Sequence, residues 1–81
     1  MYEKFQSATA ALLSSGFLVE TDLDTLIITQ RKNMLSGKIS HADGKFCLDI
    51  NGRKIYLGKE IDDVAISTIE KFLEYHLATG D

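Results

Sequence analysis

The chain has 81 residues, of which 44% are hydrophobic, and its nine basic and twelve acidic side chains give a formal net charge of −3. A chain of this length buries only about 60–65% of its unfolded surface, so we expect one core and a single compact domain over residues 1–81. The single cysteine, Cys47, excludes an internal disulfide framework and favours a cytoplasmic location, and no stretch approaches the roughly 20 apolar residues of a membrane helix.

The first predicted element is a helix over residues 2–15, because apolar side chains recur there at helical spacing. Two strands follow at residues 17–21 and 26–30, and the short acidic segment between them predicts a turn, so the pair forms a hairpin. Residues 26–28 are all apolar, which leaves open which side of the second strand points to the core.

The centre of the chain predicts a three-stranded meander. Apolar and polar side chains alternate in residues 34–41, 46–50 and 55–57. Asp43-Gly44 and Asn51-Gly52 separate these strands, and the second dipeptide suits a type I′ turn, which needs positive φ at both central positions. The alternation predicts that eight side chains face away from the core: Ser36, Lys38, Ser40, Lys45, Cys47, Asp49, Lys54 and Tyr56. Gly37 interrupts its strand and predicts a bulge or a close backbone approach.

The last predicted element is a helix that begins near Asp62, whose carboxylate can cap exposed backbone N–H groups. Its apolar side is made by Ile61, Ala65, Ile66, Ile69, Phe72, Leu73 and His76. Both helices must bury an apolar face, and the sheet must cover one of its faces. These requirements predict an α+β fold, with an antiparallel five-stranded meander and both helices packed on one face (α-β-β-β-β-β-α). The other face then meets solvent or a partner.

Charge is sorted along the chain. Residues 31–59 carry seven basic and two acidic side chains, a balance of +5, whereas residues 1–30 and 60–81 have balances of −3 and −5. Such asymmetry predicts a polarised binding surface. We expect the binding site on the outer face of the sheet, formed by Lys38, Lys45, Arg53, Lys54 and Tyr56.

No group of residues predicts catalysis. His41 lies near Ser40 and Asp43, but strand neighbours alternate between faces, so the geometry of a catalytic triad is not met and a structural His41 is expected. One cysteine and two separated histidines do not supply a zinc ligand set, and the glycines lack the spacing of phosphate-binding loops. We therefore expect a protein that is not an enzyme and uses no cofactor and no metal.

Two binding functions remain. In the first, the protein is a small accessory or regulatory module that acts through protein–protein interaction, either as a homodimer or docked on a larger protein. Such a module would use the outer sheet face or a sheet edge, since an open edge can accept a partner strand.

In the second, the basic outer face of the meander binds nucleic acid, with lysines on phosphates and Tyr56 available for stacking. Residues 51–58 and the following helix resemble the end of the three-stranded sheet domain of AP2-type factors and integrase arm-binding domains. Those domains are basic and rely on Arg and Trp along the sheet, whereas this chain has no Trp and places Cys47 and Asp49 on that face. No functional residue is carried over, and the isoelectric point near 5.2 favours the protein partner.

Overall fold

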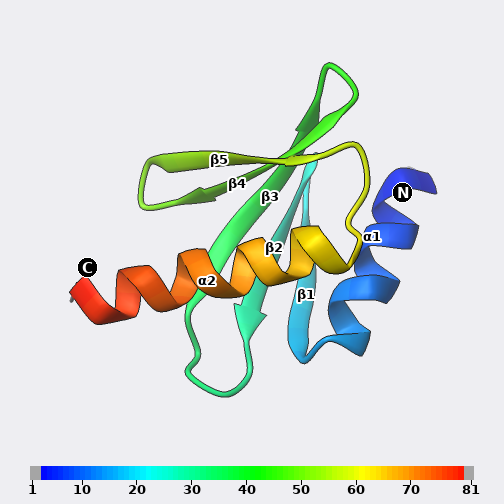
Figure 1. Ribbon diagram of the computed structural model, residues 1–81. Helices are drawn as coiled ribbons and strands as arrows, with labels where there is room; N and C mark the ends of the chain where they lie inside the picture. The colour runs from blue at the N-terminus through cyan, green and yellow to red at the C-terminus, as the bar shows by residue number, and fades with distance from the viewer. Residues whose placement is uncertain (1–2, 80–81) are drawn as a thin grey trace.

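The computed structural model describes the backbone of residues 3–79 and the side chains of residues 5–75. The elements follow one another as α1 (Glu3–Ser14), β1 (Phe17–Asp22), β2 (Thr25–Gln30), β3 (Ser36–Ala42), β4 (Lys45–Ile50), β5 (Arg53–Gly58) and α2 (Asp63–Thr79). All five strands form one antiparallel sheet in the order β1-β2-β3-β4-β5. Figure 1 shows α2 crossing one face of this sheet and α1 lying beside β1. The predicted α+β fold with a five-stranded meander between two helices is therefore confirmed.

One apolar core lies between the helices and the sheet. The helix α1 contributes Phe5, Ala8 and Leu12, because positions three and four apart share one side of a helix. The sheet and the C-terminal part of the chain contribute Phe17, Leu26, Ile28, Ile39, Phe46, Leu48, Ile50, Leu57, Ile61, Ala65, Ile66, Ile69 and Leu73. The first predicted helix begins at residue 2, which lies outside the described residues, as does the side chain of His76 in the second helix.

The second helix begins where the sequence predicts. The Asp62 carboxylate accepts a hydrogen bond from the backbone N–H of Ala65 at 2.9 Å, and the Asp62 carbonyl accepts one from the N–H of Ile66, also at 2.9 Å. The side chain thus satisfies a backbone donor that has no partner within the helix.

The structure settles the orientation of β2. Leu26, Ile28 and Gln30 point into the core, whereas Ile27 points to the opposite face and is half-buried. The burial pattern alternates strictly along the strand, as a pleated strand with one covered face requires. The all-apolar run of the sequence therefore supplies both faces of the strand.

Gly37 marks a close approach, made foremost by side chains and not by the backbone. A Cβ atom at this position would lie 2.9 Å from Ile50 Cγ1 and 3.1 Å from Leu48 Cδ1, both on β4. The missing side chain lets these two residues fill the core across β3. The bulge lies elsewhere: β5 carries one extra residue opposite Phe46, near Gly58, whose φ is +102°.

The turns follow their local sequence. Asn51 and Gly52 have φ values of 52° and 86°, so both central positions are in the left-handed region, as a type I′ turn requires. Asp43 and Gly44 repeat this arrangement with 53° and 75°. The turn between β1 and β2 differs, because Leu23 takes a φ of 55° without the freedom of glycine and is 93% exposed.

Candidate interaction surface

The sheet face opposite the helices, here called the outer face, is uncovered within the described residues. All eight side chains that the alternation assigns to it lie there in the observed register, from Ser36 on β3 to Tyr56 on β5. The strands β1 and β2 extend it. The complete outer face comprises Leu18, Glu20, Asp22, Thr25, Ile27, Thr29, Ser36, Lys38, Ser40, Ala42, Lys45, Cys47, Asp49, Lys54 and Tyr56.

Arg53 does not lie on the outer face, so its predicted placement there is wrong. Arg53 stands opposite Ile50 in the β4–β5 ladder, and Ile50 belongs to the core. Directly opposed residues of an antiparallel pair share a face. Arg53 is thus on the helix side, at the exposed start of β5. The sequence contains the information needed to place Arg53 correctly, because Arg53 and Ile55 are two residues apart on one strand and therefore point to the same face.

One row of opposed side chains crosses the whole outer face, formed by Glu20, Ile27, Lys38, Asp49 and Lys54. Ile27 separates the acidic end of the row from the part in which basic and acidic groups alternate. Cross-strand neighbours of opposite charge stabilise a sheet modestly, by about 0.2–1 kcal/mol for each pair. The row therefore holds its charges in a compensated arrangement.

The outer face as a whole is electrically balanced. It carries three lysines, namely Lys38, Lys45 and Lys54, and three acidic side chains, namely Glu20, Asp22 and Asp49. Of the basic side chains in the central segment, only Lys38, Lys45 and Lys54 lie on this face, whereas β1 brings two acids and no base to it. The sequence segment is basic, but the surface to which it contributes has no net charge.

A second row joins Ser40, Cys47 and Tyr56. The Tyr56 side chain is 78% exposed, and Cys47 is half-buried between its two neighbours. Further along the face, Thr29 Oγ1 and Ser36 Oγ lie 3.0 Å apart in a hydrogen bond. A depression of about 390 Å³ opens beside the charged row, on the side of Ser36, with Ile27, Lys38 and Asp49 in its lining. The surface thus combines small polar side chains with one large exposed aromatic ring.

His41 lies on the inner face and packs against the core. Its ring stands edge-on to Phe46, with ring centroids 4.7 Å apart and an interplanar angle of 74°. Ser40 points to the outer face, so the two side chains occupy opposite sides of the sheet. Among the residues that the structure describes, no three His, Cys, Asp or Glu side chains gather closely enough to hold a metal ion.

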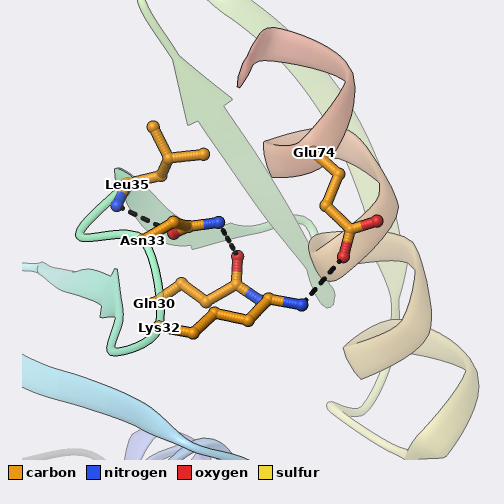
Figure 2. A network of polar contacts seen from close by, with 5 residues as sticks. All are labelled: Gln30, Lys32, Asn33, Leu35 and Glu74. Carbon is orange, nitrogen blue, oxygen red and sulfur yellow. Dashed lines mark hydrogen bonds and ion pairs between the residues drawn. The ribbon is translucent and has the colours of Figure 1, made fainter. Parts of the chain in front are cut away.

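The loop between β2 and β3 is held by polar contacts that the sequence analysis did not predict (Figure 2). Gln30 is 4% exposed, and its Oε1 accepts a hydrogen bond from Asn33 Nδ2 at 3.1 Å. Asn33 Oδ1 in turn accepts one from the backbone N–H of Leu35, also at 3.1 Å. Beside this pair, Lys32 Nζ lies 3.2 Å from Glu74 Oε2 and ties the loop to α2. The only indication of these contacts in the sequence is that polar residues, Gln30 and Asn33 among them, follow the apolar part of β2.

A second depression, of about 380 Å³, lies between α1 and the loop before α2. Its lining includes Phe46, Lys59 and Glu60, and neither a histidine nor a cysteine is among the lining residues. In the part of the chain that the structure describes, no helix combines the length and the apolar character needed to cross a membrane.

Comparison with models of known protein families, with curated protein sequences and with solved structures found no match. The comparisons therefore give no support to the resemblance to AP2-type and integrase arm-binding domains. Any function must be argued from the surface itself.

Proposed function

We propose that this protein is a small non-catalytic interaction module that docks a protein partner on the outer face of its sheet. The observation that carries the proposal is the contrast between the two faces. Both helices pack on one face, and within the described residues nothing packs on the other. A sheet face of this kind is free to receive a partner.

The chemistry of the outer face supports a protein partner. Protein interfaces combine exposed aromatic anchors with a polar rim, and Tyr56 is the kind of side chain that is enriched in their centres. Charges of both signs in a fixed row can orient a partner and reject ones with the wrong pattern. Lys38 and Asp49, opposed in register, supply both signs near the middle of the face.

The same chemistry weighs against nucleic acid. Phosphate binding needs an excess of basic groups, because affinity grows with the number of phosphates that Lys and Arg neutralise. Glu20, Asp22 and Asp49 offset the three lysines of the outer face. The chain also has a net charge of −3, which repels a polyanion at distances within the reach of electrostatic steering.

The proposal can be tested with a photo-crosslinking amino acid placed at Lys38, in the middle of the outer face. The matched control carries it at Lys71, an equally basic and exposed position on α2. We expect irradiation of cells that produce the protein to give an adduct of discrete mass with a protein from position 38 and not from position 71. An adduct of twice the mass of the chain identifies the partner as a second copy.

Two further measurements complete the test. The double change Lys38→Glu and Lys54→Glu places like charges opposite Asp49, at a cost of about 0.2–1 kcal/mol for each pair, so the fold persists. In the chain that carries the crosslinker at position 38, Lys54→Glu alone should abolish the adduct. Fluorescence anisotropy of labelled single- and double-stranded oligonucleotides, at about 50 and 200 mM salt, measures the competing function. Two outcomes would overturn the proposal. One is oligonucleotide binding that collapses with salt and fails in the double variant. The other is equal adducts from positions 38 and 71.

A further inference from the structure

The two edges of the sheet carry opposite charge. The edge strand β1 has Glu20 and Asp22 and no basic residue, whereas the edge strand β5 has Arg53 and Lys54 and no acidic residue. Within residues 3–79, no strand pairs with the open side of β5. An incoming strand therefore meets a different electrostatic environment at each edge.

The backbone of β5 is prepared for such a strand at two residues. The turn at Asn51 and Gly52 closes on the opposed pair Ile50 and Arg53, and hydrogen-bonded and non-bonded pairs alternate from there along an antiparallel ladder. Lys54 and Tyr56 fall on the non-bonded pairs. Their backbone N–H and C=O groups consequently point to the open edge.

The side chains along this edge differ between the two faces. Lys54 and Tyr56 lie on the outer face, and Lys45 reaches the same face from the neighbouring strand. On the helix side, Ile55 is half-buried and Leu57 is buried. A strand added here would place alternate residues beside these two sets, so acidic side chains match the outer positions and apolar side chains match the inner ones.

A depression lies at the end of the same edge. It has a volume of about 430 Å³, and Leu57, Gly58 and Val64 form part of its lining. Val64, in the first turn of α2, is 74% exposed although it is apolar. The depression offers a place for an apolar side chain of a strand that runs along β5.

From these observations we infer that β5 binds an extended acidic segment of a partner protein by antiparallel strand addition, with acidic side chains beside Lys54 and apolar side chains beside Ile55. The inference deepens the proposed function, because it names the edge and the chemistry of the partner segment. Strand addition takes its affinity from main-chain hydrogen bonds and its selectivity from alternate side chains.

The probe is an acetylated and amidated eight-residue peptide in which Glu and Val alternate, labelled for fluorescence anisotropy. We expect it to bind the intact protein at β5. The same peptide with Lys in place of Glu matches the acidic edge β1 instead, so its affinity should not fall on the change Lys54→Glu. Changing Lys54→Glu should weaken binding by roughly three- to tenfold. Lys71→Glu, the same change of charge on α2, should leave the binding unaltered.

Methylation of peptide amides tests the ladder itself without changing the protein. In antiparallel pairing, residues opposite Lys54 and Tyr56 share their face, so the Glu amides point to β5 and the Val amides point away. N-methylation of the Glu residues should abolish binding, and N-methylation of the Val residues should not. Equal binding of the two methylated peptides, or no binding of the parent peptide, would overturn the inference.

The outcomes separate this inference from the proposed function. An adduct from position 38 without peptide binding retains the outer face as a docking surface and removes the β5 edge. Analytical ultracentrifugation could instead show oligomers that grow with protein concentration and are lost when Glu20 and Asp22 are changed to Lys. The strand that binds β5 would then be the acidic strand β1 of a second copy, and the inference would be overturned.

Discussion

The two faces of the sheet are built by the same strands and differ in what determines them. On the inner face, side chains such as Leu26, Ile39 and Leu48 are fully buried beneath two helices. On the outer face, the same strands present Lys38, Asp49 and small hydroxyl residues. The inner face is specified by apolar volume, and the outer face is specified by charge and hydrogen bonding. Stability should therefore be concentrated on one face, and binding on the other.

The difference is visible at single residues. Gly37 on the inner face has no side chain because atoms of Leu48 and Ile50 occupy the space that a Cβ would need. Its neighbour Lys38, on the outer face, is exposed and stands between Ile27 and Asp49 in the row that crosses the sheet. Moving one residue along β3 thus changes the constraint from packing to electrostatics.

The largest expected effect is a cavity in the inner face. Leu48→Ala removes a fully buried side chain and should lower the free energy of unfolding by about 2–4 kcal/mol. Cys47→Ala changes the adjacent residue on the outer face, and a loss below about 1 kcal/mol is expected there. Urea denaturation of both variants measures the comparison, and equal losses would show that the two faces do not differ in this way. Ile69→Ala should behave like Leu48→Ala.

A smaller effect is expected where polar groups are buried at the end of the inner face. Asn33→Ala removes the donor to Gln30 Oε1 and the acceptor for the N–H of Leu35. Leaving such groups without partners costs about 1–3 kcal/mol. Thermal and urea unfolding of this variant should show that loss. Lys32→Ala, which removes only the exposed ion pair with Glu74, serves as the control, and a larger loss in the control would contradict the assignment.

The smallest effect is expected on the outer face. Lys38→Gln keeps the length of the stem and removes one charge from the row, so the change in unfolding free energy should stay below about 0.5 kcal/mol. Raising the salt concentration should reduce that change further, because exposed charges are screened. A loss comparable to that of Leu48→Ala would mean that the outer face is covered in solution.

Much of the fold follows from the sequence because alternation and turn chemistry act locally. The pattern of residues 34–57 predicts both faces of the meander, and Asn51-Gly52 predicts its last turn. The facing of β2 could not be predicted from its apolar run, since Ile27 lies outward only because β1 and β3 fix the register on both sides.

The candidate surface was less predictable for a similar reason. Its lysines were assigned to the correct face, but its balance of charge depends on β1, which is distant from them in sequence and close in space. The predicted outward placement of Arg53 is wrong because Arg53 and Ile55 are two residues apart on β5 and therefore share the inner face. The contacts of Asn33 depend on the path of a loop, which no periodicity encodes.

The topology has a consequence for how the chain is made. Each strand pairs only with its neighbours in the sequence, so the sheet needs few contacts between distant parts of the chain. Such a sheet can form in a time on the order of milliseconds. The helix α2, with 17 residues, is synthesised after all five strands. Until it leaves the ribosome, the apolar face of the growing sheet stays partly uncovered, and α1 is the only other helix in the described chain able to shield it. The synthesis of α2 is therefore also the step that covers this apolar face and protects the nascent protein from aggregation.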